Sequence, residues 1–302
     1  MKKTLLSLWL VVASVYADVA KAHIVAFAQD TMGNDWRIAQ VEEFKAGLEK
    51  HPDITFIHTD AKGKTALQLK HIEDLFARGI DVLVTSPMDA KMLSPVIAKV
   101  YRAGIPVVLL TRTVEGSEYT TFIHPKDYDI GEKAAAYIAS RLGHSGTVLM
   151  IKGVPTASTA IGRTNGFYDE IKHYPGIKVI EKTGNYLRAD AIKAVEAVLK
   201  EKHSFDAIYC QSDSMVEGVV MAMKKHGLEP KKYVIVGTDY ISKGREMIRD
   251  GDLDATFLYP TAGKEGAEAV IKILEGKKVP KEIIIDSQMI TKKNVEKVEP
   301  IF

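Results

Sequence analysis

The chain has 302 residues, 46% hydrophobic and 26% charged, which is enough apolar sequence to bury one large core or two ordinary ones. Lysine and arginine number 41 and the acidic residues 39, so the net charge of +2 argues against nucleic-acid binding through electrostatics alone. The single cysteine, Cys210, excludes an intrachain disulfide and a CxxC metal or redox site. We expect it to be a small buried side chain.

The N-terminus has the pattern of a secretory signal peptide. Two lysines follow Met1 and precede an apolar run, Leu5–Val12, that is too short to span a bilayer. We predict a signal peptide over residues 1–17 with cleavage after Ala17, and cleavage after Ala22 is the alternative. Neither site has a nearby cysteine to accept a lipid, and a small unanchored protein would diffuse away from a single-membrane cell. The prediction is therefore a soluble protein in the periplasm of a double-membraned bacterium.

From His23 onward, short β-rich apolar runs alternate with longer segments of helical period, as in a parallel sheet flanked by helices. The first half predicts, in chain order, a strand at Ile24–Ala28, a helix at Asp35–Lys50, a strand at Ile54–His58, a helix at Ala66–Arg78, a strand at Val82–Thr85, a helix at Lys91–Arg102, and strands at Val107–Leu110 and Thr121–Ile123.

After Pro125 the same alternation restarts. It predicts strands at Val148–Ile151, Lys178–Glu181, Ala207–Cys210, Val234–Val236 and Ala255–Leu258, and helices at Asp129–Arg141, Ala160–Lys172, Ala189–Lys202, Met215–His226 and Gly263–Glu275. Two cycles of similar size predict an α/β fold with two similar lobes, each a doubly wound parallel sheet. Such sheets bind ligands beyond the carboxyl ends of their strands, and the polar residues of this chain cluster at those ends.

Motifs for catalysis and cofactor binding are missing. No G-x-G-x-x-G follows the first predicted strand, and the chain has neither a P-loop nor a G-x-S-x-G nucleophile elbow. The nine histidines show no spacing typical of metal ligands. We expect no enzyme activity, no cofactor and no metal site; a secreted hydrolase or dehydrogenase is the weaker alternative.

Six segments carry a family resemblance through their order and spacing. They are Met32–Arg37, Ile105–Arg112, Arg163–Phe167, Ala207–Asp213, Val234–Asp239 and Ala255–Pro260. Together they resemble the type I periplasmic binding proteins, in the branch that contains the ribose-binding and galactofuranose-binding proteins. The resemblance covers nearly the whole chain after the predicted signal peptide.

The resemblance implies the periplasmic binding protein-like I fold, with two lobes joined by three crossings of the chain. The N-terminal lobe would comprise residues 23–127 and 260–286, and the C-terminal lobe residues 128–259 and 287–302. The first crossing would fall near His124–Asp127. A monomer is expected. Sugar-responsive repressors share this fold but need a helix-turn-helix before it, where this chain has only the signal pattern.

The resemblance also implies the residues of a ligand site between the lobes. A sugar needs rigid donor forks, carboxylate acceptors and an aromatic plate, and Arg112, Arg163, Asp239 and Trp36 correspond to these roles. The full predicted set is Asp30, Asn34, Trp36, Arg37, Thr111, Arg112, Arg163, Ser212, Asp213, Asp239 and Tyr259. The alternatives are structural: Trp36 packing on the first helix, surface ion pairs for the arginines, a helix cap for Asp213 and a turn for Asp239.

Three of these residues depart from the ribose-type pattern. Thr111 replaces an aspartate, Ser212 an asparagine and Tyr259 an amide. We expect the loss of the aspartate to leave Arg112 without its natural partner, so that a ligand carboxylate or phosphate could pair with it. The ligand is therefore predicted to be a neutral pentose or hexose, a furanose, or an anionic sugar derivative.

The predicted function is a periplasmic solute-binding protein that captures a sugar-like ligand between two lobes and delivers it to an ABC importer. The alternative is a sensing role, in which the bound form is presented to a histidine kinase or a chemoreceptor. No nucleic-acid partner is expected.

Overall fold

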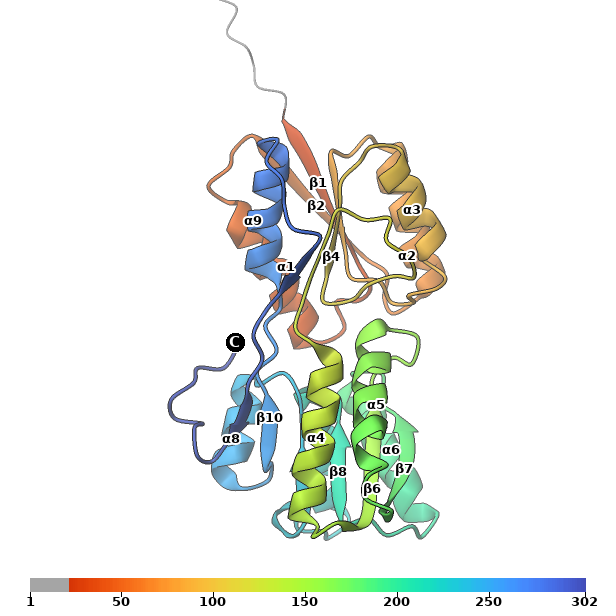
Figure 1. The fold of residues 1–302 in the computed structure, drawn as a ribbon, viewed down its shortest axis with the longest axis vertical. Coiled ribbons are helices and arrows are strands. Elements are labelled where there is room, and N and C mark those ends of the chain that lie inside the picture. The colour runs from red at the N-terminus through yellow and green to blue at the C-terminus, as the bar shows by residue number, and fades with distance from the viewer. Residues whose placement is uncertain (1–21) are drawn as a thin grey trace, which may run out of the picture.

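The computed structural model describes residues 22–302, so the predicted signal peptide lies outside the described residues. Figure 1 shows two α/β lobes, one above the other, with the chain passing several times between them. None of the helices formed by residues 22–302 has the length and apolar character needed to cross a membrane.

The first lobe is built on a six-stranded sheet in the order β11-β5-β4-β3-β1-β2. Its strands are β1 (His23–Gln29), β2 (Ile54–Asp60), β3 (Val82–Thr85), β4 (Val107–Leu110), β5 (Thr121–His124) and β11 (Glu282–Ile284). Its helices are α1 (Asp35–Leu48), α2 (Thr65–Ala77), α3 (Ser94–Arg102) and α9 (Gly263–Leu274). Every pairing in this sheet is parallel.

The second lobe repeats this plan in a sheet of order β12-β10-β9-β8-β6-β7. Its strands are β6 (Ser145–Lys152), β7 (Gly176–Thr183), β8 (Ala207–Cys210), β9 (Val234–Val236), β10 (Ala255–Phe257) and β12 (Met289–Thr291). Its helices are α4 (Asp127–Arg141), α5 (Ser158–Ile171), α6 (Arg188–Lys200), α7 (Asp213–Lys225) and α8 (Ser242–Asp250), with a 3-10 turn η1 at Pro230–Lys232. Only β12 runs antiparallel to its neighbour among these described strands.

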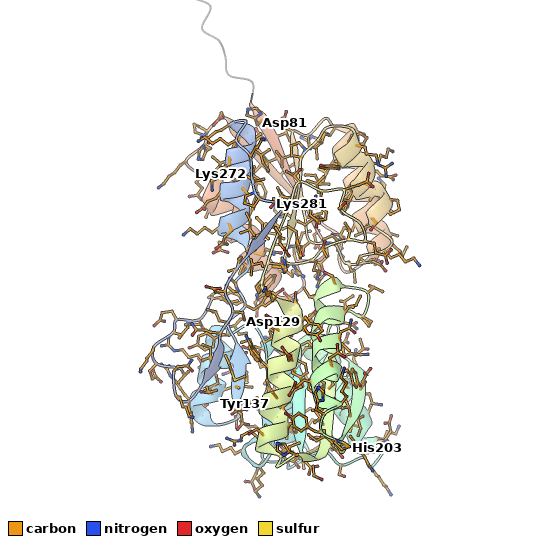
Figure 2. The ribbon with its side chains drawn as sticks, viewed as in Figure 1. Asp81, Asp129, Tyr137, His203, Lys272 and Lys281 are labelled. Atoms are coloured by element: carbon orange, nitrogen blue, oxygen red, sulfur yellow. The ribbon has the colours of Figure 1, made fainter. Side chains whose placement is uncertain are left out.

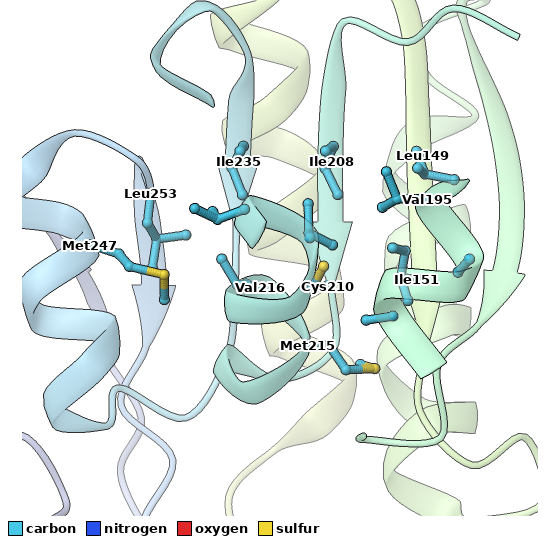
Figure 3. Close-up of a cluster of buried hydrophobic side chains, with 14 of the residues drawn as sticks. Leu149, Ile151, Val195, Ile208, Cys210, Met215, Val216, Ile235, Met247 and Leu253 are labelled. Carbon is cyan, nitrogen blue, oxygen red and sulfur yellow. The ribbon is translucent and has the colours of Figure 1, made fainter. Parts of the chain in front are cut away.

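The central strands are apolar because helices cover both faces of each sheet. All residues of β3, β4 and β8 are buried. Figure 3 shows how Leu149 and Ile208 of the second sheet pack against Val195 of α6 and Val216 of α7. Cys210 lies in the same cluster, free and fully buried, as predicted.

The chain passes between the lobes three times: from β5 to α4, from β10 to α9 and from β11 to β12. The predicted fold class is confirmed. The exact lobe boundaries stay a prediction, although each strand falls in the sheet to which that division assigns it. The sequence pattern does not indicate α8, β11, β12 or η1. The strands β11 and β12 are three-residue edge strands that are partly exposed, so they lack the continuous apolar run that indicates β9 and β10.

Side chains tie the first crossing to the strand that leads into the third. Nε2 of His124, at the end of β5, lies 2.8 Å from Oε1 of Glu282 on β11, and Nδ1 lies 2.8 Å from the carbonyl oxygen of Pro125. The His124 ring also stacks on Phe122, with centroids 3.8 Å apart. These contacts place His124 in the hinge rather than in the ligand cleft.

Two glycines bring α4 and α5 into backbone contact. A Cβ on Gly131 would lie 2.1 Å from the carbonyl oxygen of Arg163, and a Cβ on Gly166 would lie 2.0 Å from that of Tyr128. Neither position has room for a methyl group. The contact fixes α5, and with it Arg163, against the helix that follows the first crossing.

Replacing Gly166 with alanine is expected to lower the free energy of unfolding by about 1–3 kcal/mol, because the added methyl group pushes α5 away from α4. Chemical denaturation followed by circular dichroism measures this change. Gly162→Ala is the matched control on the same helix. Its Cβ would make a tight contact of 3.1 Å with the Cβ of Asp127, but it would not clash with helix backbone as that of Gly166 would, and alanine has the higher helix propensity, so a smaller loss is expected. Equal losses in the two variants would contradict the packing argument.

Candidate functional site

A cleft of about 380 Å³ lies between the lobes, close to the crossings. Its walls come from the carboxyl ends of strands and the first turns of helices in both lobes, as expected for doubly wound sheets. Nine of the eleven predicted site residues line it, together with three that the sequence did not indicate. The lining residues are Asn34, Trp36, Arg37, Thr111, Arg112, Thr159, Arg163, Tyr186, Ser212, Ser214, Asp239 and Tyr259.

The start of α1 places Trp36 in the cleft wall. Asn34 caps the helix, its Oδ1 accepting the Arg37 backbone N–H at 2.9 Å. The Trp36 indole Nε1 donates to the carbonyl oxygen of Tyr259 at 3.3 Å, and the two rings lie 5.8 Å apart at 45°. Trp36 is therefore an aromatic plate with a fixed orientation.

Asp30, at the end of β1, holds two arginines of the first lobe. Its Oδ2 accepts from Arg112 Nη1 at 2.7 Å, and its Oδ1 lies 3.3 Å from Arg37 Nε. Our expectation that Arg112 lacks a protein partner is thus wrong, because parallel strands bring the ends of β1 and β4 to one edge of the sheet. Asp30 does not line this cleft but lines an adjacent pocket, so its first role is to fix the two guanidinium groups.

The backbone is strained at Thr111, the residue before Arg112. Thr111 adopts a left-handed conformation with φ of 59°, which is uncommon for a β-branched residue. Its Oγ1 donates to the carbonyl oxygen of Leu110 at 2.8 Å. The turn aims the Arg112 side chain back toward Asp30 and the cleft. Burial first, and then the charge of Arg112, lower the pKa of Arg37 to about 10, so Arg37 remains charged at neutral pH.

Arg163, on α5, is the arginine of the second lobe. Its Nε donates to Oδ1 of Asp127 at 2.8 Å and its Nη1 to the carbonyl oxygen of Gln211 at 2.5 Å. The guanidinium lies 4.3 Å from the centroid of the Tyr259 ring. Burial lowers the pKa of Arg163, but the charge of Asp127 and other nearby groups outweigh burial and raise it overall.

The two acidic residues predicted at the ends of β8 and β9 have different surroundings. Asp239 lines the cleft, is only 6% exposed and has φ of 122°. Asp213 is fully buried behind the cleft: its Oδ2 accepts the Tyr240 N–H at 2.8 Å and its Oδ1 the Thr256 hydroxyl at 2.7 Å. The structure therefore does not place Asp213 among the ligand contacts, and Ser212 rather than Asp213 caps α7.

The sequence did not indicate Tyr186, Thr159 or Ser214 as lining residues. Tyr186 has φ of 61°, and its ring lies directly over Gly153, where a Cβ would be 1.9 Å from Cζ. Its hydroxyl lies 3.0 Å from Thr159 Oγ1. Tyr186 comes shortly after the predicted strand Lys178–Glu181. A position after the end of a strand, which several predicted site residues share, is the sequence signal that could have indicated it.

The lobes contact one another across the cleft. The Ala90 N–H donates to the carbonyl oxygen of Thr156 at 3.1 Å, and the Thr113 N–H donates to Ser158 Oγ at 2.9 Å. Each bond joins a first-lobe residue to a second-lobe residue. The structure is therefore in a closed arrangement, in which both lobes can contact one small ligand.

The charges around the cleft balance. Within residues 22–302, the guanidinium groups of the site belong to Arg37, Arg112 and Arg163, and carboxylates lie in or just behind its wall at Asp30, Asp127 and Asp239. Burial first, and then the charge of Asp213, raise the pKa of Asp239.

A periplasmic binding protein domain model matches residues 25–278, and the chain belongs to that family. The ribose import binding protein of Bacillus subtilis is 28% identical over 278 residues, 90% of this chain and 88% of that protein. The galactofuranose-binding protein of Escherichia coli is 27% identical over 86% of this chain and 85% of its own. These relatives confirm the branch to which the sequence segments pointed.

A solved structure gives the same assignment. The fructose-binding periplasmic domain of a hybrid two-component system superimposes with a TM-score of 0.86 at 28% identity, covering 91% of this chain and 92% of its own. The relatives are binding proteins and not enzymes.

The position of Asp213 predicts an unusual pH dependence of stability. Burial raises the pKa of Asp213 from an ordinary 3.8 to about 7. Because the folded state holds this proton more tightly than the unfolded state, the contribution to stability is complete below about pH 4 and is lost as the pH rises toward 7.

Asp213→Asn removes this titration, so the difference in unfolding free energy between wild type and variant should change by on the order of 2–4 kcal/mol between pH 4.5 and 7. Urea denaturation at several pH values measures it. A difference that stays constant with pH would show that Asp213 is not protonated in this window.

Proposed function

We propose that this chain is a periplasmic receptor that encloses a neutral sugar between its two lobes and delivers it to an ABC importer. The observation that carries the proposal is the closed cleft lined by an aromatic plate, Trp36, and by buried donors and acceptors from both lobes. A polyol fits such a wall, because each hydroxyl group both donates and accepts while the C–H face packs on an indole.

The charge balance favours a neutral ligand over an anionic one. Each arginine has a protein carboxylate or is close to one: Asp30 serves Arg37 and Arg112, and Asp127 serves Arg163. A ligand carboxylate would add a further buried negative charge to a wall that already has Asp30, Asp127 and Asp239 in or behind it. Sugar hydroxyls can instead use the arginine N–H groups that the carboxylates leave unused.

The names of the relatives support a single sugar unit. One relative is named for galactofuranose and another for ribose, and the solved structure reported above is named for fructose. We propose a monosaccharide, with five-membered ring forms as the first to test.

Delivery to an importer is supported by the names of the relatives and by the predicted signal peptide. We also propose that the protein is periplasmic and monomeric. A sensing role is the second candidate, because a structure at 28% identity is the periplasmic domain of a hybrid two-component system. The same closed lobes would then be read by a membrane receptor rather than by a permease.

Isothermal titration should detect binding of at least one neutral sugar among D-ribose, L-arabinose, D-fructose and D-galactose. D-Galacturonate and D-gluconate should bind more than tenfold more weakly than the best neutral sugar, because their carboxylates would be buried beside the carboxylates of Asp30, Asp127 and Asp239. If the folded protein binds none of the neutral sugars, the proposal fails. Tighter binding of an acid would reverse the argument from charge balance.

Asp239→Asn should weaken binding of that sugar at least tenfold, since a carboxylate that accepts hydroxyl hydrogen bonds is lost from a buried wall. Asp74→Asn is the control: this aspartate lies on α2, pairs with Lys70 and is 58% exposed. Thermal melting without sugar checks that both variants fold. Equal affinity of Asp239→Asn and wild type would remove Asp239 from the site.

A further inference from the structure

Asp127 is a buried carboxylate that neither the sequence motifs nor the cleft lining singles out as a site residue. It is the first residue of α4, directly after the first crossing between the lobes. Its side chain is only 11% exposed. A carboxylate in that position favours the start of a helix, but burial of the charge is costly without partners.

Both oxygens of this carboxylate have partners that line the cleft. Oδ1 accepts from Nε of Arg163 at 2.8 Å, and Oδ2 accepts from the Tyr259 hydroxyl at 3.2 Å. Arg163 belongs to α5 of the second lobe, whereas Tyr259 lies in the second crossing, between β10 and α9. One side chain therefore joins two crossings and a helix of the second lobe.

The two partners also contact each other, and both line the cleft. The Arg163 guanidinium lies 4.3 Å from the Tyr259 ring centroid, and the backbone carbonyl of Tyr259 accepts from Trp36 of the first lobe. A ligand that displaces Arg163 or Tyr259 by a few tenths of an ångström must therefore move the hydrogen bonds to Asp127. Those bonds join segments at two of the crossings between the lobes.

We propose that Asp127 is a positioning residue that couples ligand contact at Arg163 and Tyr259 to the angle of the hinge. This inference rests on the proposed function. The alternative is a purely structural role, in which Asp127 only neutralises Arg163. The two differ in what a variant changes: a structural role alters stability alone, whereas coupling alters how far the lobes close once the sugar is bound.

The test uses Asp127→Asn, which keeps the size of the side chain, and compares two measurements on the exported full chain. Titration with D-ribose, L-arabinose, D-fructose and D-galactose gives affinity, and small-angle X-ray scattering gives the radius of gyration with and without saturating sugar. The variant should bind at least tenfold more weakly, and its decrease in radius of gyration on saturation should be smaller than that of wild type.

Asp129→Asn is the matched control. Asp129 shares the charge and the first turn of α4 and lies at the cleft-side end of that helix in Figure 2. Within the described residues, however, the hydrogen bonds from Arg163 Nε and from the Tyr259 hydroxyl go to Asp127 and not to Asp129. This variant should bind and close like wild type, and a loss as large as that of Asp127→Asn would overturn the proposal.

Tyr259→Phe removes only the hydroxyl that reaches Asp127, so it tests the coupling even if Asp127→Asn folds poorly. It should weaken binding at least threefold, and the double variant should lose less than the product of the two single losses. Fully multiplicative losses, or unchanged closure in both single variants, would overturn the proposal. If wild type binds none of the sugars, the proposed function itself fails; if all variants bind and close alike, only this inference fails.

Discussion

The burial of three guanidinium groups in one small cleft is the constraint on which the site depends. An arginine that is 2% exposed, as Arg112 and Arg163 are, is stable only if carboxylates and carbonyl oxygens replace the water it has lost. Asp30 and Asp127 supply these replacements at 2.7 and 2.8 Å. The arginine forks are therefore held in place before a ligand arrives, and a ligand need not pay for their desolvation.

The topology explains how carboxylates and arginines that are far apart in the sequence come into contact. Asp30 and Arg112 are 82 positions apart, yet β1 and β4 both flank β3 in a parallel sheet, so their carboxyl ends share an edge. Asp127 and Arg163 meet because α4 and α5 touch through glycines, which removes the side-chain layer that usually separates two helices. Close helix packing thus contributes to charge pairing as well as to the core.

The features that could be predicted from the sequence are those that depend on the position of a residue along its own strand. The central strands of both sheets follow from hydrophobic period, whereas the meeting of Trp36, Arg112, Arg163 and Asp239 was implied by the family resemblance. Contacts between side chains of different helices or strands could not be predicted in this way. Neither the Asp30 ion pair nor the burial of Asp213 behind Asp239 follows from spacing, because both depend on how neighbouring strand ends and loops turn.

Contacts between different elements also connect the ligand site to the closing of the two lobes. Side chains that only lined the cleft would change affinity without changing the shape of the protein. Here the walls are built partly from the crossings themselves, since Tyr259 lies in the second crossing and its hydroxyl reaches the first residue after the first crossing. Binding free energy from contacts made only in the closed form can then shift the balance between open and closed lobes. A membrane partner that contacts both lobes could distinguish the loaded receptor from the empty one by this change in shape.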